Sequence, residues 1–169
     1  IHGHSSRIKA RFRWYGSFEE KNFGNLELKF KRNIYGWKEK YNIEQLNLEN
    51  DKDYNTIKRT ISKNLPLNTR IFFENNNIPQ IVNQYEREYF VSSDKKYRIT
   101  IDQNIKIFNQ RNTNELNLKK KTKIQNHLIL EVKFERSNYR HIENLLHNIP
   151  IRASRNSKYI NSIRAVIGI

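Results

Sequence analysis

The sequence predicts an α+β fold built mainly from antiparallel strands with one apolar and one cationic face. Basic side chains stand at alternate positions in several segments, and glycines separate the first of these segments as in hairpins. Because successive strand residues point to opposite sides, this alternation gathers the cations on one side of a sheet. No regular succession of strand and helix indicates a parallel sheet. The cations are Arg7, Lys9, Arg11, Arg13, Lys29, Lys31, Lys38 and Lys40, backed by Ile8, Phe12, Trp14, Leu26, Leu28 and Phe30.

Three strands are predicted at the start of the chain, over residues 7–15, 25–32 and 37–43. Gly16, Gly24 and Gly36 mark the turns, so the strands form a meander of hairpins.

A helix is predicted next, over residues 51–64. Its apolar residues recur at spacings of three and four, acidic residues stand at its start, and Pro66 follows its end. The apolar series is Tyr54, Ile57, Ile61 and Leu65, and the acidic residues are Asp51 and Asp53.

A second group of strands follows Pro79, over residues 81–91, 96–102 and 128–135. Residues 109–122, rich in Asn and Lys, predict a short edge strand and a mobile loop. Further helices are expected over residues 138–147 and from residue 154 to 163.

Composition restricts the partners of this chain. The formal net charge of +15 over 169 residues favours a polyanion, and the absence of cysteine excludes disulfides and thiolate chemistry. No apolar run reaches the length of a membrane span. The chain has no methionine and begins just ahead of a strand. We therefore expect one domain over residues 1–169 that continues upstream in the natural protein.

The aligned cations allow two interpretations. Charged strand residues commonly form a solvated face. Here, however, Arg11 and Arg13 align with lysines on neighbouring strands, and like charges side by side cost stability unless an anion lies among them. We therefore favour an anion-binding face.

Two carboxylates fall within this cationic setting. Glu27 stands two residues before Lys29, and Glu131 two residues before Lys133. Each carboxylate would either pair with a neighbouring base or hold a hard divalent cation that bridges phosphate oxygens.

Further polar side chains share faces in the second group of strands. Tyr85 and Arg87 lie on one face, as do Arg98, Thr100 and Asp102, and the planar guanidinium suits bidentate phosphate binding. The plain alternative is an ion pair between Arg98 and Asp102.

The last candidates lie at a predicted helix start. Ser157 and Lys158 would offer backbone N–H groups and an ammonium to a phosphate, or would form an ordinary surface cap. The histidines are scattered, and no Ser, His and Asp set is present.

Seven short segments follow one another along nearly the whole chain. They read RFRWYG at 11–16, LELK at 26–29, GWKEKY at 36–41, YER at 85–87 with Phe90, YRITID at 97–102, LEVK at 130–133 and SKY at 157–159. Together they closely resemble the VTC domain. This is the catalytic domain of polyphosphate polymerases of the vacuolar transporter chaperone type, a branch of the CYTH or triphosphate tunnel metalloenzyme superfamily.

The resemblance implies an antiparallel β-barrel tunnel with a few flanking helices. Such a tunnel would move the γ-phosphate of ATP onto a growing polyphosphate chain with Mn²⁺ or Mg²⁺. The matching positions imply catalytic roles for Arg11, Arg13, Lys29, Lys38, Arg87 and Arg98, substrate binding by Tyr85, Ser157 and Lys158, and metal binding by Glu131. On the same faces we assign Lys31, Lys40 and Lys133 to substrate binding and Glu27 to the metal.

Two departures from the family stand out. The family's first strand, with a further catalytic lysine, is not found ahead of the first segment, so we expect an incomplete tunnel. Where some relatives have a histidine, Lys31 keeps the positive charge but changes its reach and titration.

Three other functions stay open. A triphosphatase would use the same tunnel. A nucleic-acid-binding module would stack bases on Trp14, Tyr15, Trp37 and Tyr41, although we regard nucleic acid as the less favoured partner. A non-catalytic domain would sense polyphosphate for a membrane-protein partner. We expect the chain in the cytoplasm, at the cytoplasmic face of a membrane.

Overall fold

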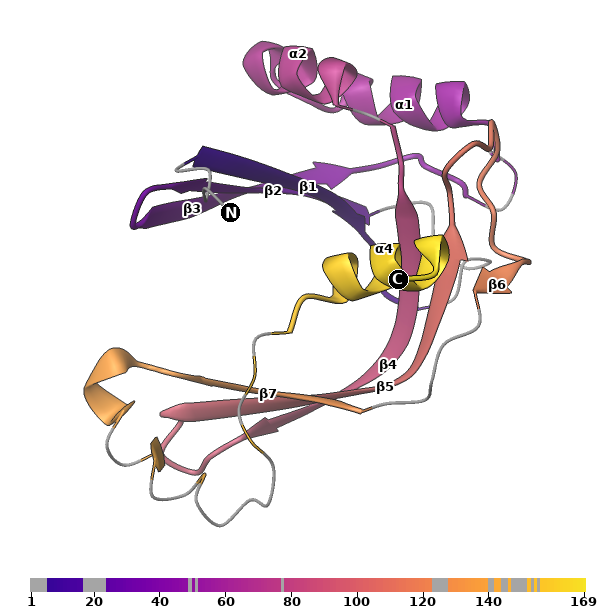
Figure 1. The fold of residues 1–169 in the computed structure, drawn as a ribbon. Coiled ribbons are helices and arrows are strands. Elements are labelled where there is room, and N and C mark those ends of the chain that lie inside the picture. The colour runs from indigo at the N-terminus through magenta and orange to yellow at the C-terminus, as the bar shows by residue number, and fades with distance from the viewer. Residues whose placement is uncertain are drawn as a thin grey trace. The chain divides into compact units, whose positions relative to one another are not determined.

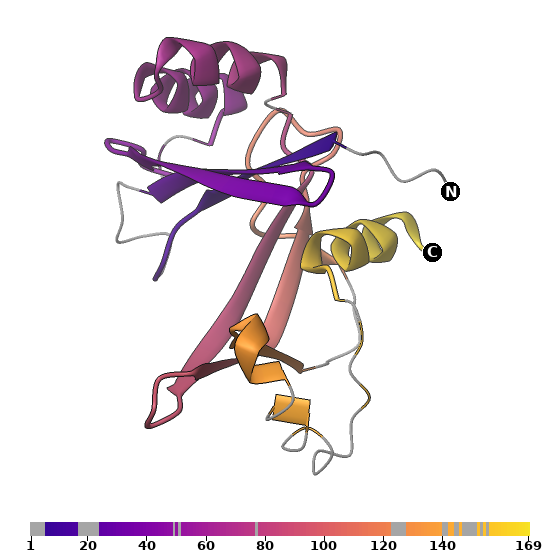
Figure 2. The same ribbon diagram turned by 90° about the vertical axis from the view of Figure 1, so that its left-hand side faces the viewer.

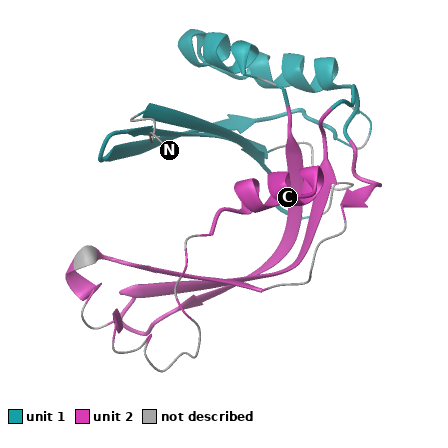
Figure 3. Ribbon diagram, in the orientation of Figure 1, with its two compact units in different colours: residues 1–78, 112–116 teal, residues 79–111, 117–169 magenta. Residues whose placement is uncertain are grey.

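The computed structural model describes residues 6–16, 24–48, 50, 52–76, 78–122, 128–139, 142–143, 146, 152, 154 and 156–169. This part of the chain is α+β and contains two antiparallel sheets (Figure 1). It divides into two compact units, unit 1 with residues 1–78 and 112–116 and unit 2 with residues 79–111 and 117–169 (Figure 3). The α+β prediction is confirmed. The pairings of the described strands close no barrel, so the tunnel stays a prediction.

Unit 1 contains a three-stranded sheet in the order β1-β2-β3. Its strands are β1 (Ser6–Arg13), β2 (Gly24–Arg32) and β3 (Tyr35–Ile43). Their bounds agree with the predicted strands within two residues. At the start of β2 only glycine fits, because a Cβ on Gly24 would lie 2.9 Å from the backbone oxygen of Arg13 and 2.3 Å from Cζ of Phe12.

Two helices follow in unit 1, α1 (Tyr54–Lys63) and α2 (Leu67–Asn75). Asp53 caps α1 by accepting a hydrogen bond from the Thr56 amide at 2.9 Å, so the helix starts inside the predicted range. Asp51 lies outside the described residues. Helix α2 was not predicted, because Leu67 and Ile71 are exposed on it and no regular apolar stripe appears.

The core of unit 1 lies between the sheet and these helices, which cover one face of it (Figure 2). Leu26, Leu28 and Ile43 form its floor, and Ile57 and Ile61 of α1 pack on them. The predicted apolar side of the sheet is thus confirmed except at Ile8, which is 44% exposed and lies outside the core. The cationic side chains project from the opposite face.

Unit 2 is built around β5 (Tyr97–Asn109), which pairs with β4 (Ile81–Val91), β6 (Lys121–Thr122) and β7 (Ile129–Phe134). The strand continues past its predicted end at residue 102 through a bulge. The register shifts between Gln84 and Glu86, where β5 supplies one residue more than β4. Asn104 lies in this bulge and has a left-handed backbone conformation, with a φ of 52°.

The C-terminal helix α4 (Lys158–Ile167) packs on β4. Ser157 is its N-cap, so the helix begins four residues after the predicted start at 154. The Ser162 hydroxyl donates a hydrogen bond to Asn83 Oδ1 at 2.9 Å. After β7 the chain forms a short 3₁₀ turn, η1 (Arg136–Asn138). Half of the helix predicted over 138–147 lies outside the described residues, and residues 139, 142, 143 and 146 are helical. None of the described helices has the length and apolar character needed to cross a membrane.

Replacing Leu28 with alanine should lower the free energy of unfolding by about 3 kcal/mol, because the change leaves a cavity in the core of unit 1. Urea unfolding followed by circular dichroism measures the change. Ile34→Ala is the matched control, since Ile34 is 86% exposed and its loss should cost less than about 0.5 kcal/mol. Equal losses in the two variants would contradict this assignment of the core.

Candidate anion-binding site

One face of the unit 1 sheet carries rows of like charge. Lys29 lies directly opposite both Lys9 and Lys38, and Arg7 lies opposite Lys31. Directly opposed residues bring their Cβ atoms to about 5 Å, so these cations repel one another. We call this surface face 1; its cations are Arg7, Lys9, Arg11, Arg13, Lys29, Lys31, Lys38 and Lys40.

A buried carboxylate lies within face 1. Glu27 is 5% exposed and pairs with Arg11. Its Oε1 lies 3.3 Å from Lys38 Nζ and 3.7 Å from Arg13 Nη1. Burial raises the pKa of Glu27, but the Arg11 hydrogen bond and the neighbouring cations outweigh this effect and hold the pKa below its usual value. Glu27 therefore remains an anion and orients three cations.

Other cations of face 1 are not compensated in this way. Within the part of the chain that the structure describes, Lys29, Lys31 and Lys40 form no ion pair. All three are exposed. They are the groups that an added anion would neutralise.

Unit 2 has a second buried carboxylate. Asp102 is 0% exposed and accepts two hydrogen bonds from Arg87, at 2.5 Å from Nε and 2.7 Å from Nη2. Lys158 at the start of α4 pairs with the same carboxylate. Burial raises the pKa of Asp102, yet the bonds from Arg87 and Lys158 outweigh it, so the pKa lies below its usual value.

Aromatic rings lie beside the cations of Arg87 and Lys158. The Arg87 guanidinium lies 5.3 Å from the ring centre of Tyr85 and 5.7 Å from that of Tyr89, and Lys158 Nζ lies 5.2 Å from that of Tyr85. Tyr85 stands where the β5 bulge shifts the register. The strands and the helix thus bring Tyr85, Arg87 and Lys158 together, as a phosphate clamp requires.

The same face continues along β5 and β7. Arg98 lies opposite Lys133, and Thr100 lies opposite Glu131. Arg98 is exposed, and none of the described carboxylates pairs with it. We call this surface face 2; its members are Tyr85, Arg87, Arg98, Thr100, Asp102, Glu131, Lys133 and Lys158.

Glu27 and Glu131 differ in how far neighbouring cations already neutralise the carboxylate that would bind a metal. Glu27 is surrounded by cations, as its ion-pair interpretation requires, and its metal role stays a prediction. Glu131 is half-buried and pairs with Lys133 at 3.3 Å, and the buried hydroxyl of Thr100 opposite it has no hydrogen-bond partner among the described residues. No cluster of three metal-binding side chains occurs in the described part. Glu131 is therefore the better single ligand for a hard cation that is also held by phosphate oxygens.

Sequence reasoning grouped the cations but did not find the partners of Asp102. The plain alternative of an ion pair with Arg98, four residues earlier on the same strand, is wrong, because the partners of Asp102 come from β4 and α4. Ser157 stands at the helix start as predicted, and its hydroxyl accepts from the Ile160 amide at 3.5 Å.

The pattern of cations, buried carboxylates and strands can be compared with known families. Residues 1–167 match the family model of the VTC domain. The chain belongs to the VTC domain family. Membership suggests a function related to polyphosphate, in keeping with the cationic faces of this VTC domain. No curated protein and no solved structure matched the chain.

Replacing Asp102 with asparagine should lower the free energy of unfolding by about 3 kcal/mol at pH 7, because Arg87 and Lys158 lose their shared anion. The lowered pKa means that the unfolded chain takes up the proton first. The contribution of Asp102 is therefore complete above about pH 5 and is lost as the pH falls through the unfolded value of about 3.9 and then the folded value.

Denaturant unfolding of both proteins between pH 7 and pH 2.5 tests this expectation. Glu74→Gln is the control, since Glu74 is exposed and its carboxylate forms no ion pair with a described residue, so loss of its charge should leave stability unchanged at pH 7. A constant difference between wild type and Asp102→Asn down to pH 2.5 would contradict the ion-pair assignment.

Proposed function

We propose that this VTC domain is a polyphosphate polymerase that transfers the γ-phosphate of ATP to a growing polyphosphate chain. One observation carries the proposal. On each of the two sheets, cations oriented by a buried carboxylate lie beside exposed cations that pair with no carboxylate of the described residues. Face 1 contributes Lys29, Lys31 and Lys40, and face 2 contributes Arg98. Linear polyphosphate presents anions at the regular spacing that such rows suit.

The paired cations have a different part in the proposal from the unpaired ones. Arg11, Arg13 and Lys38 are fixed by Glu27, and Arg87 and Lys158 by Asp102. Groups held before the substrate arrives need no reorganisation when charge develops on the transferring phosphoryl oxygens. The unpaired cations then neutralise the bulk of the bound polymer.

Little covalent chemistry is required of the protein. Phosphoryl transfer depends mainly on holding donor and acceptor in line and on stabilising charge on the equatorial oxygens. The terminal phosphate of the chain is already an anionic nucleophile, so these residues need supply no general base. Mn²⁺ or Mg²⁺, when bound, would offset charge between donor and acceptor phosphates, and Glu131 is the residue that would hold it.

The remaining features follow the family resemblance. We include in the proposal the β-barrel tunnel, ATP and inorganic polyphosphate as ligands, a cytoplasmic site at a membrane face and a membrane-protein partner.

Incubation of the complete protein with radiolabelled ATP and Mn²⁺ should yield an acid-labile phosphate ladder on a gel. Replacing Arg98 with alanine should reduce the rate of chain growth by about 100-fold or more, because a phosphate-binding cation is lost. The melting temperature should stay unchanged, since Arg98 is exposed. Lys96→Ala is the control, because Lys96 lies in the preceding turn and pairs only with Asp94.

The products decide among the alternatives. Free phosphate without a ladder would replace the polymerase by a triphosphatase. Binding of polyphosphate without turnover would indicate a sensor. Salt-sensitive binding of RNA or DNA with no response to ATP or metal would indicate a nucleic-acid module.

A further inference from the structure

One buried hydroxyl of face 2 has no partner in the described part of the chain. Thr100 is 7% exposed, and its Oγ1 is shielded from solvent without a hydrogen bond to any described residue. A buried hydroxyl without a partner destabilises the folded state, so native proteins satisfy nearly all such groups. Neither the family resemblance nor the ion pairs of face 2 give Thr100 a function. A hydroxyl kept at this cost indicates a bond that forms when a ligand binds.

A buried threonine of unit 1 shows the usual arrangement. Thr69 in α2 is 9% exposed, and its hydroxyl lies 2.8 Å from the hydroxyl of Tyr41. Thr69 and Thr100 are therefore buried to the same degree and differ in whether the hydroxyl has a partner.

The neighbours of Thr100 on face 2 restrict which group could accept its hydroxyl. Thr100 lies opposite Tyr89 of β4 and Glu131 of β7. Directly opposed residues have Cβ atoms about 5 Å apart, so a Glu131 carboxylate turned towards β5 would reach the hydroxyl. Asp102, two residues along β5, already accepts bonds from two cations, and the ring of Tyr89 lies beside Arg87. Glu131 is therefore the carboxylate best placed to accept from Thr100.

The Glu131 carboxylate is turned along its own strand in this structure. Its Oε1 lies 3.3 Å from Lys133 Nζ, and the two side chains are 43% and 52% exposed. An ion pair with this exposure contributes little to stability, so an anion that binds Lys133 can separate it at small cost. The pair therefore does not prevent another orientation of the carboxylate.

We propose that Thr100 is a positioning residue for Glu131. Its hydroxyl donates a hydrogen bond to one carboxylate oxygen and leaves the other oxygen for a divalent cation that phosphate also holds. A bond of this kind to a metal-binding side chain typically accounts for about 10- to 100-fold in metal affinity. The inference rests on the proposed function in so far as Glu131 holds the metal that accompanies polyphosphate.

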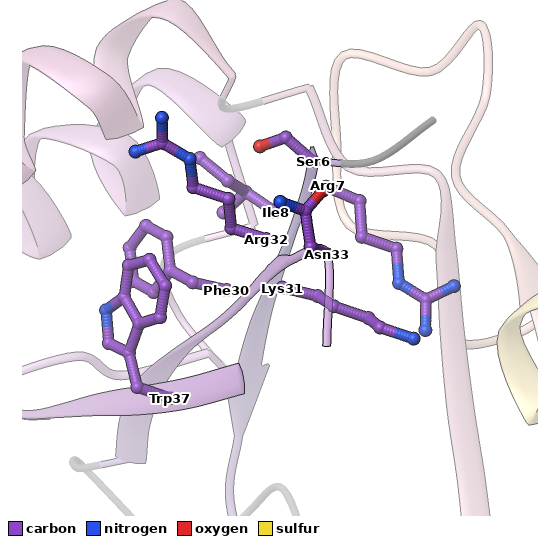
Figure 4. Close-up of a pocket in the computed structure, with 8 residues that line it drawn as sticks. All are labelled: Ser6, Arg7, Ile8, Phe30, Lys31, Arg32, Asn33 and Trp37. Atoms are coloured by element: carbon purple, nitrogen blue, oxygen red, sulfur yellow. The ribbon is translucent and has the colours of Figure 1, made fainter. Parts of the chain in front are cut away.

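The end of the unit 1 sheet provides a comparison without a carboxylate. A pocket of about 550 Å³ lies there, and its lining contains no Asp or Glu. Arg7 and Lys31 lie opposite each other in this lining, and their side chains extend away from the rings of Phe30 and Trp37 (Figure 4). A divalent cation should not strengthen the binding of an anion to these two side chains, because no carboxylate is present to hold it.

Calorimetric titration of the complete protein with inorganic tripolyphosphate, once with Mn²⁺ and once with EDTA, tests the proposal. The ratio of the two affinities measures the contribution of the divalent cation. Thr100→Val should reduce this ratio about 10- to 100-fold and leave the affinity in EDTA unchanged. Thr100→Ser keeps the hydroxyl and should retain the wild-type ratio. Lys31→Ala should weaken binding by the same factor in both solutions, since it removes a cation and no metal ligand.

Thermal unfolding without tripolyphosphate distinguishes this role from a structural one. Thr100→Val removes a buried hydroxyl without a partner and should raise the melting temperature by about 2 °C. Thr69→Val is the matched control. It removes a bonded hydroxyl, so it should lower the melting temperature and leave the affinity ratio unchanged. A fall in the melting temperature of Thr100→Val would show that the hydroxyl is bonded within the protein and would overturn the proposal.

The variant Glu131→Gln determines whether Thr100 acts through Glu131. In that background Thr100→Val should change the affinity ratio by less than about 2-fold, because the carboxylate that the hydroxyl orients is missing. Losses that multiply in the double variant would contradict the proposal.

The proposed function and the role of Thr100 can fail separately. A reduced ratio in Thr100→Val, together with no phosphate ladder from ATP, would uphold the role of Thr100 and refute the polymerase. A phosphate ladder with an unchanged ratio in Thr100→Val would uphold the polymerase and overturn the role of Thr100.

Discussion

Two buried carboxylates, Glu27 and Asp102, are the constraint on which the charged faces depend. A buried carboxylate is costly unless cations and hydrogen bonds compensate it, and arginines at strand spacing repel unless an anion separates them. In this protein the cations compensate the buried carboxylates, and the carboxylates reduce the repulsion between the cations. Glu27 draws cations from β1 and β3, and Asp102 draws them from β4 and α4. The protein thereby keeps some of its cations ordered while the others remain available.

Aromatic side chains restrict the cations further in both units. Tyr85 and Tyr89 lie beside Arg87, and in unit 1 Arg13 lies over Tyr15 with its Nη1 3.0 Å from the hydroxyl. A guanidinium confined between a ring and a carboxylate loses little further freedom when it binds a phosphate. Orientation of this kind helps a charged surface discriminate among anions instead of merely attracting them.

The amino-acid pattern predicted the parts of the fold that depend on neighbouring residues. Alternation along β1, β2 and β3 is a local property, so the sequence alone predicted both faces of this sheet. It placed Leu26 and Leu28 on the apolar side, and Arg11, Arg13 and Glu27 together on the other. Helix α2 could not, since its exposed Leu67 and Ile71 obscure the helical period. The partners of Asp102 could not be read either, because they depend on strand register and on where α4 packs.

The bulge in β5 shifts its pairing with β4 by one residue. On the C-terminal side of Asn104, odd-numbered residues such as Ile107 lie opposite odd-numbered residues of β4, whereas on the other side the even-numbered Asp102 lies opposite Arg87. One residue of chain length thus decides whether the carboxylate meets its arginine or is turned to the reverse of the sheet. Loss of the single residue Asn104 would turn the side chains on one side of the bulge to the opposite face of the sheet. In this strand the spacing of residues therefore matters to the charge pattern as much as their composition does.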